Sequence, residues 1–436
     1  MKTRLAALLS VVLAVSAACS SGAPGPTNDP AGIQLARADV ARAAVSAADA
    51  TAAAASINAF GLDLYRRLGA SGGNVVFSPA SVAIALAMTR AGARGETATE
   101  MDAVLHALGA DALAADMNAL DQALAGRSGT FNDEAGKPHD VTLNIANAPF
   151  AQRGMAFTPG YLETLAGSYG AGVRLLDYAR DPEAARKLIN AWVDVRTEHR
   201  IPELLAAGTI TDMTRLALVN AIYLKAAWQT AFDPALTKPG PFTRPGSSSV
   251  DVPMMHANLS LPYAEGNGWR AVELPYIGGS LAMTVIVPDD LAAFEQGLGT
   301  ESLAWSDAFH QVVSGLQERP VDLTFPRFSL QTSADLATIL AAMGMPRAFD
   351  GDLADFSGIT TAEQLVISAV IHQANIDVDE KGTVAAAATA VVMRATAIPT
   401  EPVTLKVDRP FIFLLRDVPT GAIVFMGRVV DPGAKG

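Results

Sequence analysis

The feature that most restricts how this chain can fold is an uncharged stretch near its carboxyl end, GTVAAAATAVVM, from Gly382 to Met393. It contains no charge, no proline and no aromatic ring. Alanine favours helices, whereas valine and threonine favour strands, so residue preference alone leaves an apolar helix and a buried strand both open. As a strand, the stretch presents small side chains on both faces, because successive side chains alternate.

The composition indicates a large, acidic, packed protein. Half of the 436 residues are hydrophobic, which is ample for a sizeable core. The formal charge is −12, from 32 basic and 44 acidic residues, and the chain has no long basic run. No nucleic-acid partner is therefore expected, because phosphate binding requires clustered Lys and Arg.

Residues 1–18 are predicted to be a secretion signal. Lys2 and Arg4 precede an apolar run from Leu5 to Val15 that is too short to span a membrane with normal flanks. Small residues then lead to Cys19, the only cysteine in the chain. This arrangement resembles a bacterial lipoprotein box, which implies that Cys19 is acylated and anchors the chain in a membrane. The alternative is plain secretion with an incidental free cysteine, so the protein is expected to be exported, as a cell-surface lipoprotein or extracellular.

The remaining chain divides into a tether and one domain. Residues 19–50 combine a flexible Ser/Gly/Pro-rich tether, anchored at its lipid end, with an alanine-rich lead-in. Residues 51–436 alternate helical and strand patterns without a repeat or a linker, which predicts a single α+β domain with mixed, mainly antiparallel sheets. We expect a helix at 181–200, strands at 141–151, 216–228 and 365–382, and two more strands around the turn DVPTG.

The sequence shows no signal for a cofactor site, a metal site or a catalytic site. The polar, mixed-charge insert 126–140 is expected to be a loose loop, and no basic helix suits a heparin-like cofactor. The six histidines lack metal-ligand spacing, and no G-x-S-x-G elbow is present. We therefore predict no metal, no cofactor and no enzyme activity.

Five segments, taken in order, resemble the serpin family from about Asn58 to Pro432. They are NVVFSPASVAIALAMTRAGARGETATEM, LVNAIYLKAAW, VELPYIGGSLAMTVIVP, HQANIDVDEKGTVAAAAT and DRPFIFLLRDVPTGAIVFMGRVVDP. The resemblance implies the serpin fold, in which helices surround mixed, mainly antiparallel sheets. It also implies a monomer with an exposed reactive-centre loop at about 380–402.

The resemblance further implies a suicide inhibitor of serine proteases. The protease cuts the loop and is held as an acyl-enzyme, while the loop inserts as a new central strand of the main sheet. The alternative is a non-inhibitory binding protein on the same scaffold. Charges, prolines or bulky residues typically interrupt the hinge in such members, and the run from Gly382 to Met393 has none.

The family's loop pattern assigns roles to individual residues of this chain. The usual loop length places the reactive bond at Thr396–Ala397, which suits an elastase-like or subtilisin-like protease. The rival bond is Arg394–Ala395, which would imply a trypsin-like target. The hinge that starts insertion comprises Glu380, Gly382, Thr383, Ala385, Ala386, Ala387, Ala388 and Thr389.

A second set of residues matches the region where the strands of the main sheet must part. Ser78, Ser81, Asn220 and His372 match a polar cluster beneath the sheet, and Trp228 matches the tryptophan at the point of loop entry. A buried, hydrogen-bonded histidine would have the same appearance and would also keep the sheet closed.

Overall fold

The computed structural model of the chain describes residues 27–28, 32–133, 135–297, 302–383 and 401–434. The predicted signal sequence, Cys19 and the loop residues from Val384 to Thr400 lie outside these ranges. Within the described residues, no helix combines the length and the apolar character needed to cross a membrane.

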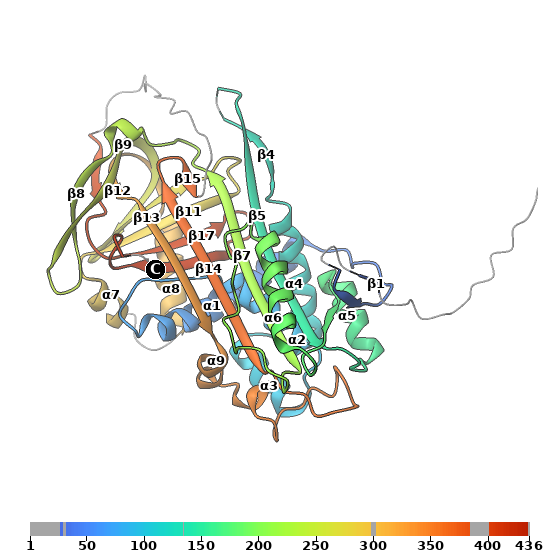
Figure 1. Cartoon of the computed structure of the whole chain (residues 1–436). Coiled ribbons are helices and arrows are strands. Elements are labelled where there is room, and N and C mark those ends of the chain that lie inside the picture. Colours follow the sequence, from blue (N-terminus) through green and yellow to red (C-terminus); the bar gives the residue numbers. More distant parts are fainter. Residues whose placement is uncertain (1–26, 29–31, 134, 298–301, 384–400, 435–436) are drawn as a thin grey trace, which may run out of the picture.

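The first of two large sheets contains the strands expected to part. Its order is β1-β2-β6-β5-β7-β15-β14-β13, with β4 paired to β5 outside this order (Figure 1). The pairs β5–β6 and β7–β14 are parallel and all others antiparallel. The strands are β1 (Thr27–Asn28), β2 (Gln34–Ala36), β4 (Gly129–Asn132), β5 (Pro138–Gln152), β6 (Val173–Leu176), β7 (Leu216–Ala227), β13 (Phe328–Asp335), β14 (Ala369–Asp379) and β15 (Gly382–Thr383).

The second sheet packs behind one end of the first. Its order is β16-β12-β9-β10-β11-β17-β18-β3, with β8 paired to β9. Only the β12–β16 pair is parallel among its described pairings. The strands are β3 (Val75–Phe77), β8 (Lys238–Thr243), β9 (Ser249–Gly266), β10 (Trp269–Pro275), β11 (Leu281–Pro288), β12 (Gln317–Pro326), β16 (Val403–Lys406), β17 (Phe411–Asp417) and β18 (Ile423–Val429).

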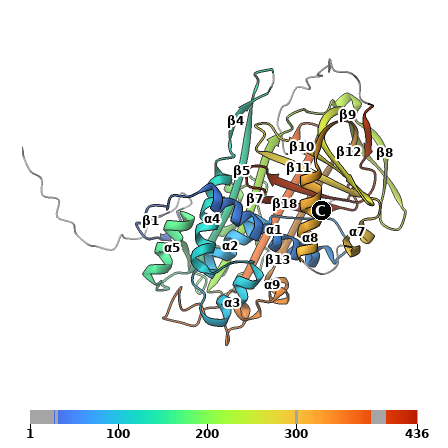
Figure 2. The same ribbon diagram turned by 180° about the vertical axis from the view of Figure 1, so that it is seen from behind.

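Helices cover both faces of the first sheet. In the view from behind, α1, α2 and α4 lie against its back (Figure 2), whereas α6 lies across its front (Figure 1). The helices are α1 (Ala47–Gly69), α2 (Pro79–Arg90), α3 (Gly95–Val104), α4 (Ala110–Ala125), α5 (Pro159–Tyr169), α6 (Pro182–Arg196), α7 (Leu291–Gly297), α8 (Ser302–Gly315) and α9 (Ala337–Met343).

Helix α2 positions part of the polar cluster. The Ser78 side chain caps it by accepting from the Ser81 backbone N–H, and Pro79 takes the first helical position. Every residue of α2 is buried, and the helix contacts β5 and β7 of one sheet and β18 of the other. This apolar helix thus fills the space between the sheets and brings both serines beneath β7.

The architecture confirms the α+β fold with mixed, mainly antiparallel sheets. The expected helix 181–200 is α6, and the two carboxyl-terminal strands are β17 and β18. The prediction of a loose loop at 126–140 is wrong, because β4 pairs with β5 from Gly129↔Val141 to Asn132↔Pro138. Asp133 orders the intervening turn by accepting hydrogen bonds, which overall polarity does not reveal.

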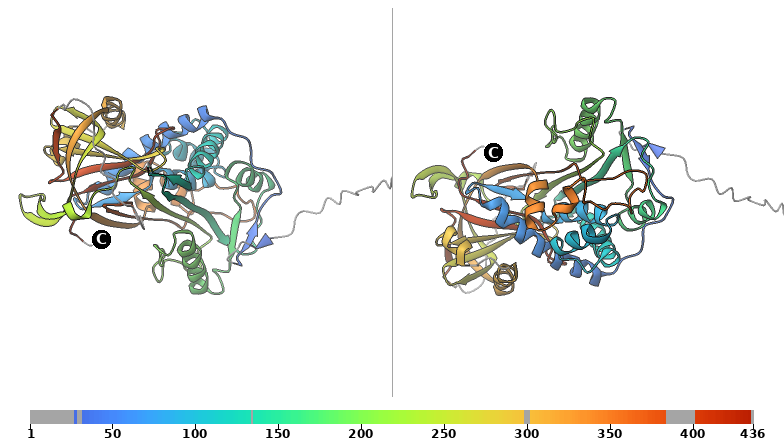
Figure 3. Two further views of the ribbon diagram at one scale, coloured as in Figure 1. Left: turned by 90° about the horizontal axis from the view of Figure 1, so that it is seen from above. Right: turned by 90° about the horizontal axis from the view of Figure 1, so that it is seen from below.

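Packing also extends upstream of residue 51, where the sequence pattern places the start of the domain. Ile33 is buried and β2 adds to the sheet edge beside β6. Arg42 donates to Asn118 at 2.8 Å and to Asp121 at 2.6 Å on α4. Seen from above and below, β1 and β2 lie at the end of the molecule far from the second sheet (Figure 3).

Candidate functional site: the seam between two parallel strands

The candidate site is the line between β7 and β14, called the seam below. The two strands are parallel and paired directly from Ala217↔Ala369 to Ile222↔Ala374. Their outer neighbours, β5 and β13, run antiparallel to them. Parallel pairing is slightly less stable per residue than antiparallel pairing, so this seam is the weakest line in the centre of the sheet.

At one end of the seam the strands diverge and hold the short strand β15 between them. Gly382 and Thr383 pair with Ala227 and Ala226 of β7, and on their other side with β14. Strand β15 runs antiparallel to both neighbours. Two hinge residues, Gly382 and Thr383, therefore already lie between the two strands.

The backbone at Gly382 leaves no room for a side chain. Its φ of +144° is a conformation that other residues rarely adopt. A Cβ there would lie 2.2 Å from the Ala226 carbonyl oxygen and 2.8 Å from the Ala227 Cα. Glycine thus lets the chain turn into the seam against the backbone of β7.

Aromatic rings hold the next residue. The Thr383 side chain is buried, and its hydroxyl lies 2.6 Å from the hydroxyl of Tyr276. Tyr276 stacks on Trp228 with ring centroids 4.5 Å apart, and the Trp228 indole N–H donates to the Asp379 carbonyl at 2.9 Å. Sequence reasoning found Trp228 but missed Tyr276, because the chain positions do not reveal the stacking.

Glu380, two residues before Gly382, makes a second set of contacts at the same end of the seam. Its carboxylate is buried and accepts hydrogen bonds from Arg327, at 2.7 Å from Nε, and from the Thr237 hydroxyl. Burial alone would raise the pKa of Glu380, but these hydrogen bonds outweigh burial and lower the pKa. The ion pair ties the start of the hinge to the strand pair β12–β13, and neither partner of Glu380 was predicted from the sequence.

Beneath the middle of the seam lies the polar cluster. Asn220 on β7 and His372 on β14 are paired directly across the seam, and the His372 Nδ1 contacts the Asn220 Oδ1. The Asn220 side-chain amide also donates to Ser81 at 2.5 Å and to Asn147 of β5 at 2.6 Å. The cluster links β5, β7, β14 and α2, and Asn147 is the member that sequence reasoning missed.

The hydrogen bonds fix the tautomer of His372. The Ser78 backbone N–H donates to Nε2 at 3.1 Å, so Nε2 must be an acceptor and Nδ1 carries the proton given to Asn220. The ring is 1% exposed, and burial lowers its pKa to about 3. Protonation of Nε2 would remove the acceptor that Ser78 needs, so the closed seam requires neutral His372.

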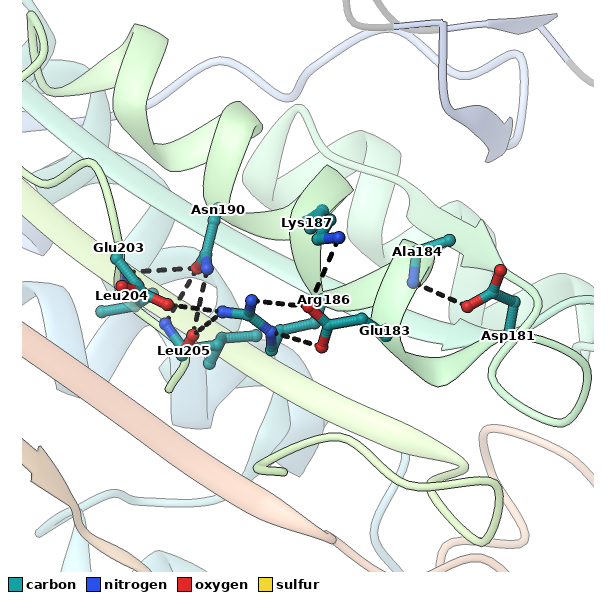
Figure 4. Close-up of polar contacts among 9 residues, drawn as sticks. All are labelled: Asp181, Glu183, Ala184, Arg186, Lys187, Asn190, Glu203, Leu204 and Leu205. Atoms are coloured by element: carbon teal, nitrogen blue, oxygen red, sulfur yellow. Dashed lines mark hydrogen bonds and ion pairs between the residues drawn. The ribbon is translucent and has the colours of Figure 1, made fainter. Parts of the chain in front are cut away.

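Helix α6 and the segment after it cover the front of the sheet. Arg186 binds Glu183 and Glu203 and donates to the Leu205 carbonyl at 2.6 Å, and Asn190 bonds the backbone at Leu204 and Leu205 (Figure 4). These contacts fold the chain after α6 back along the helix. The outgoing segment is thereby held against the sheet.

Residues 196–200, at the end of α6 and just after it, contact both sides of the seam. Glu198 accepts a hydrogen bond from Tyr223 of β7 at 3.1 Å. Arg200 pairs with Asp377 of β14 at 3.1 Å, and its carbonyl accepts from the Asn375 side chain at 2.9 Å. A strand that enters between β7 and β14 must stretch or break these contacts.

The structure thus gathers the predicted residues at two places. Ser78, Ser81, Asn220 and His372 meet beneath the seam, and Trp228, Glu380, Gly382 and Thr383 meet at its open end. The remaining hinge residues and both proposed reactive bonds, Thr396–Ala397 and Arg394–Ala395, lie outside the described residues. Within the described chain, no group of three or more His, Cys, Asp or Glu side chains could hold a metal ion.

Comparison with known proteins decides the family. The model of the serpin (serine protease inhibitor) family matches residues 55–432. The chain belongs to the serpin family. An uncharacterised serpin-like protein of Thermococcus kodakarensis is 38% identical over 86% of this chain and 85% of its own. The leukocyte elastase inhibitor of Bos taurus is 38% identical over 83% of this chain and 93% of its own.

Solved serpin structures share the fold. The thermophilic serpin tengpin in its native state matches 91% of this chain and 97% of its own, with a TM-score of 0.77 and 26% identity. Serpin48 of Tenebrio molitor matches with a TM-score of 0.73 and 28% identity. The predicted serpin fold is confirmed, and members of this family are serine protease inhibitors.

We expect His372 to make this serpin less stable in mild acid. Its pKa is about 3 in the folded state and about 6.5 in the unfolded state. The unfolded state therefore binds one more proton between these values, and stability falls by up to about 1.4 kcal/mol per pH unit as pH drops from 6.5 toward 3. Denaturant unfolding midpoints at pH 7, 6 and 5 measure this dependence. His372→Asn should flatten it, and an unchanged slope would contradict this role for His372.

We expect Arg200→Ala to ease opening of the seam. The Arg200 and Asp377 side chains are each about half exposed, so their ion pair is weak. Its loss should lower the free-energy barrier to separation of β7 and β14 by less than about 1 kcal/mol. A synthetic peptide of residues 384–393 should then enter the seam about two to five times faster, as followed by its fluorescent label. Lys187→Ala, on the outer side of α6, is the control, and equal rates for both variants would refute a role for the Arg200 pair.

Proposed function

We propose that this serpin is a suicide inhibitor that traps serine proteases by inserting its cut loop into the seam. The observation that carries the proposal is β15: two hinge residues already lie between β7 and β14, antiparallel to both. A longer strand in this position would replace one short parallel pairing by two antiparallel ladders. Completion of the sheet supplies the free energy, so the intact form would be kinetically trapped.

The length of the uncharged stretch supports this use of the seam. On β7, Gly382 lies opposite Ala227 and Thr383 opposite Ala226. Continuation of this register would place Met393 opposite Leu216, the first residue of β7. The uncharged run would thus cover β7 from end to end. Arg394, the first charge, would fall just beyond it.

The register on β14 leads to the same limit. Gly382 lies opposite Asp379, and continuation of the pairing would place Val392 opposite Ala369, the first residue of β14. Both neighbours therefore end where the uncharged run ends. The uncharged run therefore matches the length of the paired β7 and β14, which supports insertion of the whole run.

Continuation of these registers also connects the loop with the polar cluster. Thr389 would lie opposite Asn220 on one side and His372 on the other. The direct contact between Asn220 and His372 would have to break, and the threonine hydroxyl could then hydrogen-bond in its place. This explains why polar side chains at the centre of the seam need not prevent insertion.

The chemistry belongs to the protease. Its serine oxygen attacks the scissile carbonyl, the new amino terminus leaves, and an ester joins the loop to the enzyme. Hydrolysis of this ester would free the enzyme. Insertion of about 14 residues would carry the protease roughly 45 Å along the sheet and distort it before water completes the reaction. The inhibitor itself performs no catalysis.

The target class follows from the proposed reactive bond. Small residues at Thr396–Ala397 suit the shallow pockets of elastase-like or subtilisin-like proteases. The names of the bovine and porcine relatives as leukocyte elastase inhibitors support this choice. Cleavage at Arg394–Ala395 would instead indicate a trypsin-like target.

The proposed location is outside the cell, with a lipid at Cys19 as the anchor. The first described residues form β1, which pairs with β2 at the outer edge of the sheet. Residues 19–26 would then link a membrane to that edge. Globomycin sensitivity of precursor processing and labelling with a radioactive fatty acid would test this anchor.

Introducing a charge into the inserting strand should turn the inhibitor into a substrate. Thr383→Arg cannot be accommodated where the threonine is 1% exposed, so the cut loop should fail to enter and the protease should be released active. We expect loss of the SDS-stable complex with elastase, subtilisin or trypsin, whichever the parent protein traps. Thr383→Ser keeps the hydroxyl and should still trap.

Ala387→Arg provides a second test that avoids the buried site of Thr383. In the continued register, residue 387 would lie opposite Ile222 and Ala374. Trapping by both arginine variants at the parental level would contradict insertion. Simple cleavage of the parent protein, with protease activity retained, would instead favour a non-inhibitory binding protein.

Cleavage of the loop should markedly stabilise the inhibitor. The parent protein is nicked with a protease that does not form a complex, and its melting temperature is compared with that of the intact form. We expect a rise of more than about 20 °C, since two strand ladders are added to the core sheet. An unchanged melting temperature would indicate that the loop stays outside. Mass analysis of the fragment released by the protease that is trapped assigns the reactive bond, because its first residue is Ala397 or Ala395 in the two alternatives.

A further inference from the structure

Helix α6 has a second apolar face, on the side turned away from the sheet. Its buried face, which includes Ile189 and Val193, packs against β5 and β7. On the opposite side, Leu188 is 42% exposed and Val195 is 69% exposed. A helix that only covers a sheet normally carries polar residues on that side, so this face calls for a different explanation.

The exposed apolar residues of α6 form a single stripe. Ala184, Leu188, Ala191 and Val195 are all exposed and follow one another at spacings of four, three and four residues. At about 100° per residue, their directions fall within about 60° of each other. Leu188 and Val195 take the a positions of a short heptad pattern, and the two alanines take the d positions. This spacing is typical of a helix that packs against another helix.

The position of α6 leaves the stripe accessible. The helix lies across the front of the sheet in Figure 1, and in both views of Figure 3 it is the green helix that projects from the front of the molecule. The segment after α6 folds back along the helix through bonds to Arg186 and Asn190, which are not part of the stripe. The stripe is therefore open to a second helix.

The stripe is complementary to a second copy of itself. In an antiparallel pair of α6 helices related by a twofold axis, Ala184 would face Val195 of the second copy, and Leu188 would face Ala191. Each large side chain would then meet a small one, which fills the space between two helices evenly. A parallel pair would instead place Leu188 against Leu188 and Ala191 against Ala191. The antiparallel pair is therefore the better fit.

The charges beside the stripe fit the same arrangement. Lys187 and Asp194 lie one heptad apart on the same flank, at the g positions. In the antiparallel pair these positions face each other, so Lys187 of each copy would lie near Asp194 of the other. Within its own chain, Lys187 lies 3.6 Å from Glu183, and Asp194 lies 2.7 Å from the exposed His199. An ammonium group has three donors and a carboxylate has two oxygens, so each can bind a further partner.

We propose that the outer face of α6 is a contact surface for a second copy of this chain. The two copies form a twofold, antiparallel pair of α6 helices, with the apolar stripe at its centre and the Lys187–Asp194 pairs at its rim. This contact goes beyond the monomer that the family resemblance implies. It uses neither the seam nor the loop, so it does not depend on the proposed function.

The size of the contact limits its strength. Two stripes of four residues cover much less than the roughly 800 Å² per partner of a stable interface. The chain is also acidic, with a formal charge of −12, so two copies repel each other at low salt. We therefore expect a reversible dimer with a dissociation constant between about 10 µM and 1 mM.

Sedimentation velocity over about 5 to 300 µM protein, at about 0.15 M salt, tests this contact. The protein is the chain from residue 19 with Cys19→Ser, which excludes a lipid and a disulfide and retains every described residue. We expect a monomer at the lowest concentration and a rising share of dimer at the highest. A chain that stays monomeric throughout would overturn the proposal and leave the stripe to a partner of different chemistry.

A charge in the stripe should prevent pairing. Val195→Glu should lower the association constant at least tenfold, because the carboxylate would be buried between two helices. The melting temperature should stay within about 2 °C of the parent, because Val195 is already largely exposed. The matched control is Val418→Glu, at an exposed valine in the turn between β17 and β18, which should pair like the parent. Equal weakening by both variants, or by neither, would overturn the proposal.

Exchange of the flanking charges tests the antiparallel direction. Asp194→Lys leaves only like charges at the facing g positions and should weaken association about threefold, although it makes the chain less acidic. The double variant Lys187→Glu/Asp194→Lys restores opposite charges and the parental net charge, and it should pair like the parent. Melting temperatures confirm that both variants are folded. A double variant as weak as Asp194→Lys would contradict the antiparallel pair.

Discussion

The structure depends on one constraint: β7 and β14 run parallel and adjacent at the centre of a sheet, where a strand between them would be antiparallel to both. Direct pairing between β7 and β14 provides backbone hydrogen-bond partners along only part of each strand. Toward the open end the partners diverge, and β15 occupies the first positions of the gap. In the proposed mechanism, loop insertion would give a better-paired sheet, and the intact form would persist because contacts resist opening of the seam.

Those contacts lie at three places in the sheet, which differ in how far they are exposed to solvent. Beneath the sheet, Asn220 and His372 hold the two strands together through fully buried hydrogen bonds, which are costly to leave unmade. At the open end, buried Glu380 pairs with Arg327. On the solvent face, the Arg200–Asp377 pair is exposed and screened. In the proposed mechanism, the buried contacts would contribute most to the barrier against opening of the seam, and the exposed pair would contribute less.

The sequence predicted the fold and much of the site, for identifiable reasons. Segments that are continuous in the chain, such as the family-like stretch at the start of α2 and the glycine that opens the uncharged run, led to Ser78 and Gly382. Tyr276, Arg327 and Asn147 were missed because each acts through a partner far away in the chain, and no local spacing records such a contact. The hairpin at 126–140 was misjudged for a related reason, since its order arises from hydrogen bonds to one aspartate and from packing against Gly278.

In the proposed mechanism, loop insertion competes with hydrolysis of the acyl-enzyme, and the position of β15 bears on the rate of insertion. A strand that starts outside a sheet must first part its neighbours and lose chain entropy before any ladder forms. Here Gly382 and Thr383 have already met that cost, and each further residue extends two ladders that have begun.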